Sequence, residues 1–324
     1  MTKIIAELCQ NHNGDKFILD EMISAASESG ASIAKIQSID SNELTHRPRF
    51  DEGLIEGGKT KIIKRPFKDE YNRLKKLDLN IKDNEKFIEL CNKYKIIPSI
   101  TIFSFSKINI MFDIGFKFIK VASFDCASHK LIEEICKKKF DHLIISTGAT
   151  YNREIEKTVS IVKKNTTKFS LLHCISIYPT PLNEANLSRI DYLKSLTNSV
   201  GLSDHSNPDE NSNLLSAAAL TYEIDYIERH FTVLKKDESK DGPVSVNPSQ
   251  LADLVNLTKL SRKKLFDYIN EKKVDLKILN GNKNRDLSDI ELLNRDYYQG
   301  RFASKNKDGK IVYNWDTTTS FDFD

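Results

Sequence analysis

Residues 199–230 read SVGLSDHSNPDENSNLLSAAALTYEIDYIERH, and this stretch determines the fold that the sequence predicts. It begins and ends with short apolar runs, Ser199–Ser203 and Asp225–His230, each of a length typical of a buried strand. Between them, the string SNPDE places capping residues and a proline at a helix start, and Asp209–Leu220 has a helical pattern. A strand, a helix and a second strand in this order predict two parallel strands joined by a helix.

The same alternation repeats along the whole chain. The predicted strands are Lys3–Cys9, Ser32–Ser38, Ile96–Thr101, Lys117–Val121, His142–Thr147, Lys168–Cys174, Ser199–Ser203 and Asp225–His230. The predicted helices are about Lys16–Ser29, Lys82–Tyr94, Phe105–Phe112, Ser128–Lys138, Asn152–Lys164, Glu184–Leu196, Asp209–Leu220 and Ser249–Tyr268. Eight strand–helix pairs in succession predict a closed parallel barrel, the (β/α)8 TIM barrel of the α/β class.

An open, doubly wound parallel sheet is the rival architecture. Such a sheet normally has a glycine-rich phosphate loop of the form G-x-G-x-x-G after its first strand. Here the first strand ends in Glu-Leu-Cys-Gln-Asn-His-Asn-Gly, which lacks that pattern. The sequence therefore favours the barrel.

Two segments depart from the regular alternation. Residues 39–80 form a long polar insertion, rich in Lys and Arg, which we expect to cover the catalytic face. Residues 269–324 are polar and aromatic, and they are too few to be trusted as an independent domain. We therefore predict one barrel domain over residues 1–268 and a short C-terminal extension over residues 269–324.

The composition excludes several classes of protein. The 49 basic and 46 acidic residues nearly cancel, so there is no electrostatic case for nucleic acid or an anionic membrane as a partner. The five cysteines show no C-x-x-C spacing, which favours a reducing compartment over a disulfide framework. No signal peptide or membrane span is evident. We expect a cytoplasmic protein.

Two lysines occupy positions inside predicted strands, where charged side chains are costly. Lys35 and Lys120 alternate with apolar neighbours, so both point into the barrel, and Lys35 shares its side with Gln37. Two such lysines indicate a multiply charged ligand, with Ser146 and Ser203 adding donors of the kind that hold phosphate. The alternative is a structural ion pair with a carboxylate of the lumen, such as Glu7 or Glu228.

Two histidines close neighbouring strands of the predicted barrel. His205 and His230, together with Glu7 on the first strand, form a plausible site with two nitrogens and one oxygen. A divalent first-row ion suits these ligands; we expect Mn²⁺, with Mg²⁺ or Co²⁺ as alternatives. The competing interpretation is that one histidine is a hydrogen-bonded core residue or an acid–base catalyst without metal.

Seven strings lie in order at these strand ends and together resemble one family. They are IAELCQNHNGD, AKIQS, IKVASFD, ISTGAT, LLHCISIYPTPLNEANL, VGLSDHS and IERHFT. They resemble the sialic-acid synthases, that is, N-acetylneuraminate synthase and its relatives for bacterial nonulosonic acids. The resemblance covers about residues 3–255.

The resemblance implies a function and a set of roles. The family condenses phosphoenolpyruvate with the open-chain aldehyde of an N-acylated amino sugar, N-acetylmannosamine or a 2,4-diacetamido hexose, to give a nine-carbon 2-keto acid and phosphate. Carried over by motif, the phosphoenolpyruvate-binding residues are Lys35, Lys120, Ser123, Ser146 and Ser203. Glu7 and Gln37 serve the reacting centre, Tyr178 and Asp241 face the sugar, and His205 and His230 ligate the metal.

The sequence departs from the family pattern at three places. Ser176, which belongs to the substrate-binding set, stands where relatives carry Asn, and Gly242 stands where they carry His. Residues 269–324 do not show the pattern of the antifreeze-like domain that ends many members. That departure leaves the sugar open and weakens the case for a domain-exchanged dimer, although we still expect a homodimer through the barrels.

Two alternatives to the synthase remain. Phosphoenolpyruvate could condense with a phosphorylated aldose on the same barrel, which would need a second basic cluster. The insertion contains candidates for it, namely Arg47, Arg49, Lys59, Lys61, Lys64 and Arg65. The other alternative is a catalytically silent barrel that binds a sugar phosphate.

Overall fold

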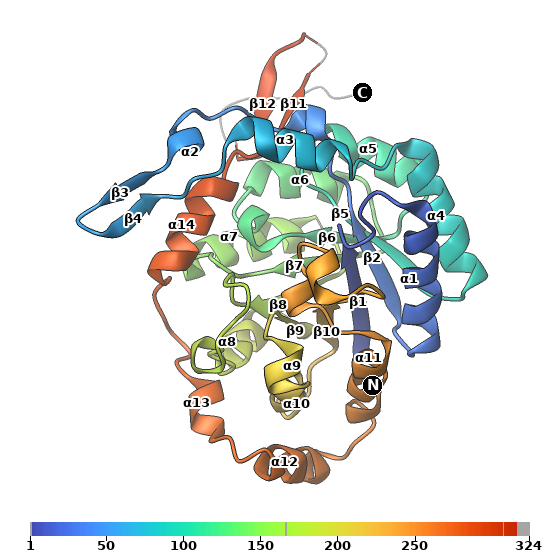
Figure 1. The fold of residues 1–324 in the computed structure, drawn as a ribbon, viewed down its shortest axis with the longest axis vertical. Coiled ribbons are helices and arrows are strands. Elements are labelled where there is room, and N and C mark those ends of the chain that lie inside the picture. The colour runs from blue at the N-terminus through green and yellow to red at the C-terminus, as the bar shows by residue number, and fades with distance from the viewer. Residues whose placement is uncertain (1, 166, 307, 316–324) are drawn as a thin grey trace.

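The computed structural model describes residues 2–165, 167–306 and 308–315, and its centre is a closed barrel of eight parallel strands (Figure 1). The strands are β1 (Lys3–Cys9), β2 (Ile33–Gln37), β5 (Ile97–Thr101), β6 (Phe118–Val121), β7 (His142–Ser146), β8 (Phe169–Cys174), β9 (Val200–Asp204) and β10 (Tyr226–His230). They pair in chain order, and β1 closes the ring by pairing with both β2 and β10. The predicted (β/α)8 barrel is confirmed.

Helices on the outside of the barrel connect successive strands. They are α1 (Lys16–Glu28), α4 (Ile81–Lys93), α5 (Ser106–Asp113), α6 (His129–Lys137), α7 (Asn152–Lys164), α8 (Arg189–Leu196), α10 (Leu214–Leu220) and α11 (Pro248–Leu257). Several begin at a capping side chain. For example, the Asn247 side chain accepts a hydrogen bond from the backbone N–H of Gln250, and the backbone N–H of Asn247 donates one to Gln250 Oε1.

Two predicted helices are each divided into two. The segment predicted as Asp209–Leu220 forms α9 (Pro208–Asn211) and α10, because Ser212 adopts a positive φ of 50° between them. The segment predicted as Ser249–Tyr268 forms α11 and α12 (Arg262–Glu271). There the Ser261 side chain accepts from the N–H of Lys264 and starts a new helix. Local capping chemistry thus interrupts an apolar pattern that continues across each break.

The strands bury two different faces. Outward side chains such as Ile4, Ala34 and Ile119 pack under the helices in the main core. Inward side chains form a separate apolar layer inside the barrel, consisting of Ile5, Ile33, Ile144, Leu172 and Tyr226. The residues two positions further along these strands are polar: Glu7, Lys35, Ser146, Cys174 and Glu228. Because side chains alternate along a strand, this polar layer faces inward at the carboxyl ends of the strands.

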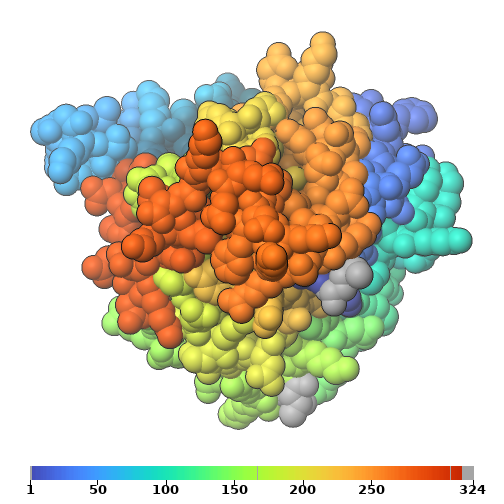
Figure 2. Space-filling view, turned by 90° about the horizontal axis from the view of Figure 1, so that it is seen from below, coloured from blue at the N-terminus to red at the C-terminus, as the bar shows by residue number. Residues whose placement is uncertain are grey.

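The insertion after β2 extends beyond the barrel. It contains α2 (Arg49–Glu52), the hairpin of β3 (Leu54–Glu56) and β4 (Lys59–Ile62), and α3 (Phe67–Lys75). In Figure 1 the hairpin projects at the left, and in Figure 2 it forms a light blue arm on the same side.

The C-terminal extension runs along the barrel to the same rim as the insertion. Its elements are α13 (Leu276–Asn280), α14 (Asp289–Tyr298), β11 (Ala303–Lys305) and β12 (Ile311–Tyr313). Seen from below, the orange residues of α12 and α13 spread across the face in Figure 2. The extension then meets the insertion, where Leu44 bridges to Phe302 and Arg49 pairs with Asp296 at 2.6 Å.

The division at residue 268 stays a prediction, and α12 runs across that position. Residues 316–324 of the predicted extension lie outside the described part of the chain. Among the described helices, none combines the length and apolarity that crossing a membrane requires.

Candidate active site

The polar layer opens into a cavity of about 550 Å³ at the carboxyl ends of the strands. We call it the strand-end cavity. The predicted site residues that line it are Glu7, Lys35, Gln37, Lys120, Ser123, Ser146, Tyr178, Ser203, His205, His230 and Asp241. The structure therefore brings together residues from seven of the barrel strands and the loops that follow them, although they span most of the sequence.

Ser176 is the predicted site residue that does not line the cavity. It is fully buried, and its backbone contacts the C-terminal extension: its N–H donates to Glu291 at 3.4 Å, and its carbonyl accepts from Asn294 at 3.1 Å. The space in front of its hydroxyl is occupied by Gly148, where an added Cβ would lie 2.5 Å from Ser176 Oγ. Ser176 thus supports the cavity wall, and its predicted contact with substrate remains a prediction.

A network of buried charges forms the floor of the strand-end cavity. Lys35 contacts the Glu7 carboxylate and lies 3.6 Å from Glu228. Lys120 Nζ lies 3.0 Å from Glu228 Oε1, which also accepts from Ser203 Oγ at 2.8 Å. The side chains of the two lysines and two glutamates are at most 4% exposed. The structural ion pairs considered as the alternative are therefore present, and burial alone does not require the lysines to bind a ligand.

The network shifts the proton affinities of its members. Burial lowers the pKa of Lys35 to about 7, an effect that the Glu228 carboxylate opposes and the Lys120 charge reinforces. Burial by itself would raise the pKa of Glu228, but Lys120 and Lys35 hold it well below its usual range. Glu228 therefore keeps its negative charge, while Lys35 can gain or lose a proton near neutral pH.

The two predicted metal-binding histidines lie side by side, with ring centroids 5.2 Å apart. His205 directly follows β9 and His230 ends β10, and these two strands pair as predicted. The Nδ1 of His205 lies 3.1 Å from the Ile175 carbonyl, so a proton on Nδ1 leaves Nε2 free to accept. Burial lowers the pKa of His205 to about 3 and lowers that of His230. Both rings are therefore neutral at physiological pH, the form in which imidazole binds a metal.

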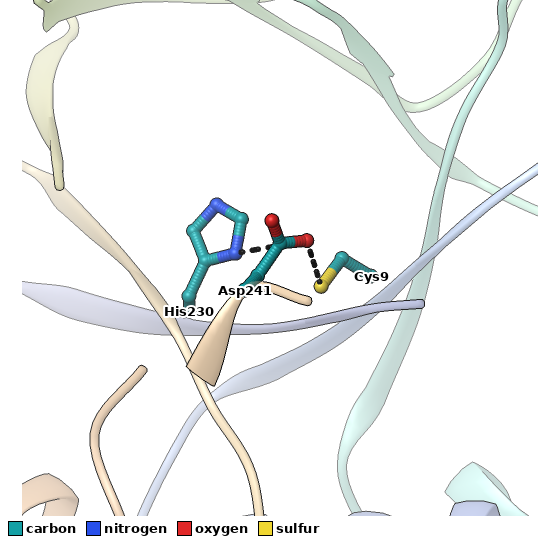
Figure 3. Close-up of side chains that lie close together, drawn as sticks. All are labelled: Cys9, His230 and Asp241. Carbon is teal, nitrogen blue, oxygen red and sulfur yellow. Dashed lines mark hydrogen bonds and ion pairs between the residues drawn. The ribbon is translucent and has the colours of Figure 1, made fainter. Parts of the chain in front are cut away.

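A carboxylate oxygen of Asp241 lies beside His230. Figure 3 shows Asp241 Oδ2 between His230 Nδ1, at 3.9 Å, and Cys9 Sγ, at 3.1 Å. The predicted oxygen from Glu7 is engaged elsewhere: one carboxylate oxygen contacts Lys35 and the other accepts from the N–H of Cys9. Glu7 also lies opposite His230 in the register of β1 and β10, and its expected part in the donor set stays a prediction.

These side chains fit a divalent ion. Ligand atoms of Cys9, His230 and Asp241 all lie within 4.8 Å of one another, and His230 Nδ1 is buried without a hydrogen-bond partner among the described residues. Burial and the Asp241 carboxylate raise the pKa of the Cys9 thiol, so that it acts as a donor to Asp241 rather than as a thiolate. His205 does not belong to this group of ligand atoms, so the remaining donors within it are one imidazole and one carboxylate, which suit Mn²⁺ and similar borderline ions.

Several cavity residues were missed by reasoning from the sequence. The barrel loops contribute Gln10, Asp125 and Lys240, and the extension contributes Tyr298 and Arg301. The insertion contributes Arg73, together with Arg65, which the sequence had indicated as a candidate for a second basic cluster. Gln10 connects two of these regions, because its Oε1 accepts from Arg73 at 2.6 Å and its Nε2 donates to Gln37 at 3.2 Å. The insertion and extension have no strand periodicity, so nothing in the sequence aligned their side chains with the barrel.

The extension forms one wall of the cavity. Tyr298 stacks on Phe124 with ring centroids 4.3 Å apart and planes 7° from parallel. Asn314 donates to Asp125 at 2.6 Å. Burial raises the pKa of Asp125 to about 7, although the hydrogen bonds from Ser128 and Asn314 lower it. The wall therefore contains a carboxyl group that can be neutral near physiological pH.

The sequence of this chain is similar to those of several known proteins. The sequence profile of the NeuB family matches residues 22–269. The N,N'-diacetyllegionaminic acid synthase of Campylobacter jejuni is 29% identical over 280 residues, which cover 83% of this chain and 78% of that protein. The pseudaminic acid synthase of Helicobacter pylori is 27% identical, covering 80% of this chain and 74% of its own.

A solved structure is similar over almost the whole chain. The N-acetylneuraminic acid synthetase of Leptospira borgpetersenii, in complex with citrate, superposes with a TM-score of 0.68 and 29% identity. The match covers 91% of this chain and 90% of that one. A heptulosonate-phosphate synthase of Thermotoga maritima, at 14% identity and a TM-score of 0.58, shares the fold.

Proposed function

This chain belongs to the NeuB family, and from that premise we propose that it condenses phosphoenolpyruvate with the open-chain aldehyde of an N-acylated amino sugar. The products are a nine-carbon 2-keto acid, that is, a nonulosonic acid, and inorganic phosphate. The observation that carries the proposal is the strand-end cavity, in which a buried lysine–carboxylate network lies beside two neutral imidazoles and a carboxylate. The similar proteins are named synthases, which favours an enzyme over a silent barrel.

Phosphoenolpyruvate is assigned to the floor of the cavity. Lys120 and Lys35 supply positive charge there, and Ser123, Ser146 and Ser203 supply hydroxyl groups. The Ser146 hydroxyl is buried without a hydrogen-bond partner among the described residues, so it is available to a ligand. Binding of a trianion between the lysines would replace part of their pairing with Glu7 and Glu228.

The reaction balances with water as the third reactant. The methylene carbon of phosphoenolpyruvate forms a bond to the aldehyde carbon, and the aldehyde oxygen takes a proton to become a hydroxyl group. Water then adds at the former enol carbon and loses a proton. Cleavage of the bond between that carbon and the phosphate oxygen yields the keto group and inorganic phosphate.

The residues of the chain have distinct tasks in this scheme. Glu7 accepts the proton of the attacking water, which requires that its contact with Lys35 loosen once phosphoenolpyruvate occupies the floor. Lys120 and Lys35 stabilise the charge on the departing phosphate. Tyr178, whose side chain is 46% exposed and stacks near His205, and Asp241 face the sugar.

We propose that His205, His230 and Asp241 hold a divalent ion, Mn²⁺ by preference. The bound ion supplies Lewis-acid polarisation of the aldehyde oxygen. We also propose a homodimer, because twofold symmetric dimers are the commonest oligomers of soluble enzymes. A cytoplasmic location belongs to the same proposal, because the five cysteines are free.

The deciding experiment measures phosphate released from phosphoenolpyruvate in the presence of Mn²⁺. N-acetylmannosamine and 2,4-diacetamido hexoses are supplied in turn, with EDTA and sugar-free controls. Release that requires both a sugar and the metal supports the condensation. The proposal is abandoned if no acylated sugar, phosphorylated or not, gives release above the sugar-free control.

A further inference from the structure

The outer end of the strand-end cavity carries an excess of positive charge. Arg65, Arg73, Lys240 and Arg301 line it, and the carboxylate that pairs with them is Glu70. We call these four side chains the outer basic cluster. Four cations against one carboxylate contrast with the floor of the cavity, where two lysines face two glutamates.

Glu70 forms ion pairs with two members of the outer basic cluster. Arg73 donates to both of its oxygens, each at 2.9 Å, and Arg301 donates to Oε1. The Glu70 carboxylate is 8% exposed and Arg301 is 6% exposed, so this pairing is buried. Glu70 therefore fixes the position of two guanidinium groups, and within the described part of the chain it makes no ion pair with the other two cations.

Arg65 and Lys240 lack an anionic partner. Within the described part of the chain, neither side chain makes an ion pair or a hydrogen bond. The Arg65 guanidinium lies over the Tyr297 ring, 5.1 Å from its centroid, which orients the group without neutralising it. The Arg301 Nε is buried without a hydrogen-bond partner among the described residues. The cluster thus has hydrogen-bond donors without acceptors and a positive charge that the described residues do not neutralise.

The charges of the cluster act on one another. Arg73 and Arg301 both donate to Glu70 Oε1, which brings their two positive groups close together. Such mutual repulsion is relieved when an anion binds between the cations.

The outer basic cluster is joined to the metal-donor side of the cavity. Lys240 directly precedes Asp241, and Arg73 reaches Gln37 through Gln10. A ligand whose aldehyde lies near Asp241 and His230 therefore shares one cavity with the cations of the cluster. The cluster is contributed by three separate parts of the chain: the insertion, the loop after β10 and the extension.

We propose that the outer basic cluster binds a phosphate monoester on the sugar, so that the substrate is an N-acylated amino sugar phosphate whose phosphate lies far from the aldehyde. This inference rests on the proposed condensation and specifies its second substrate. Arginine pairs well with phosphate because its planar donors match two oxygens at once. Phosphoenolpyruvate keeps the floor of the cavity, so the two phosphates occupy separate ends.

The test compares N-acetylmannosamine with N-acetylmannosamine 6-phosphate in the phosphate-release assay, with Mn²⁺ and saturating phosphoenolpyruvate. We expect kcat/KM to be at least about tenfold higher for the phosphorylated sugar, the effect of one or two charge-assisted hydrogen bonds. In Arg65→Gln and Lys240→Gln this preference should fall about tenfold, with the KM for phosphoenolpyruvate unchanged. Lys64→Gln is the matched control, because Lys64 is exposed, adjacent in sequence and absent from the cavity lining.

Each outcome separates the inference from the proposed function. Equal use of both sugars, or preference for the unphosphorylated one, overturns the phosphate site while leaving the condensation intact. If Arg65→Gln and Lys240→Gln keep the preference for the phosphorylated sugar unaltered, the phosphate site is likewise overturned and the condensation is not affected. If neither sugar is turned over, calorimetric titration of both sugars in the presence of phosphoenolpyruvate decides. Tighter binding of the phosphorylated sugar that is lost in Arg65→Gln supports the site, and equal or absent binding refutes it.

Discussion

Single residues at the strand ends carry the chemistry, and their positions follow from the alternation of side chains along a strand. Lys35 and Glu7 share the inward face with the apolar residues two positions before them, Ile33 and Ile5. The sequence left two interpretations of Lys35 and Lys120 open, namely that they bind a charged ligand or that they form structural ion pairs. The structure contains the ion pairs, so the case for an anionic ligand rests on the whole cavity and on the family, not on the lysines alone.

The metal assignment can be tested at His230. We expect His230→Ala to abolish metal-dependent phosphate release, because Asp241 then loses its neighbouring nitrogen donor. The fold should persist, since the ring makes no hydrogen bond through Nδ1 within the described residues. The measurements are phosphate release and circular dichroism. His46→Ala, at an exposed imidazole outside the cavity, is the control. Unchanged turnover in His230→Ala would remove His230 from the metal site.

A second prediction at this scale concerns the buried carboxyl group of Asp125. Its pKa is raised by burial from 3.8 to about 7, so the folded protein binds a proton more tightly than the unfolded chain. The associated stability is present below about pH 4 and is lost as the pH rises through about 7. The loss is on the order of 4 kcal/mol for a shift of about three units.

Asp125→Asn removes this titration while keeping an oxygen for the hydrogen bond from Asn314. We expect the free energy of unfolding of the variant, relative to wild type, to increase between pH 5 and pH 8. Urea denaturation at both pH values measures it. Asp253→Asn, at an exposed carboxylate on α11, should show no such change. Parallel pH profiles for wild type and Asp125→Asn would show that Asp125 is ionised in the folded protein.

At the scale of elements, the barrel strands are held at separations that leave little room for extra atoms. Gly201 in β9 is opposite Tyr226 of β10, and an added Cβ would lie 2.4 Å from the Tyr226 carbonyl oxygen and 2.6 Å from Leu172 Cδ2. The carbonyl is part of the barrel backbone, so it cannot move without shifting β10. The metal-donor residue His230 lies on that same strand.

We therefore expect Gly201→Ala to lower the free energy of unfolding by about 1–3 kcal/mol, the usual cost of overpacking. Urea denaturation measures it, with Asn198→Ala in the exposed segment before β9 as control. Equal stability of Gly201→Ala and wild type would mean that β9 and β10 can separate more easily than their contacts indicate.

The cavity residues of the insertion and the extension are positioned by tertiary packing, not by a periodic pattern in the sequence. Arg301 and Arg73 come from segments more than two hundred residues apart in sequence, yet both donate to Glu70. Neither segment has a periodicity that predicts which side chains face the barrel. Only the packing of α14 beside the insertion selects Arg301 and Tyr298 for the cavity (Figure 1).

At the scale of the whole molecule, the chain is a NeuB-family enzyme, as the seven strand-end motifs predicted. Metal binding should be measurable as stability of the whole fold, independently of activity. A ligand that binds only the folded state adds about 2.7 kcal/mol at one hundred times its Kd. We expect Mn²⁺ to raise the melting temperature, EDTA to reverse this, and His205→Ala to abolish it. A melting temperature that does not respond to Mn²⁺ would contradict the proposed site.

The sequence by itself determined the barrel, the order of its strands and eleven of the residues that line its cavity. It did so because period-two alternation and helix signals are local properties, and because parallel strands in a closed barrel present their carboxyl ends at one rim. Helix boundaries at Ser212 and Ser261 were missed, since a single φ angle or capping bond interrupts an otherwise continuous pattern.

Tertiary structure alone decided how the charges pair. Glu7 contacts Lys35, Asp241 lies beside His230, and the backbone of Ser176 contacts the C-terminal extension. The outer basic cluster likewise exists only in the fold. Electrostatic energy depends on distances of a few ångströms between groups that are remote in sequence, and no local pattern encodes those distances.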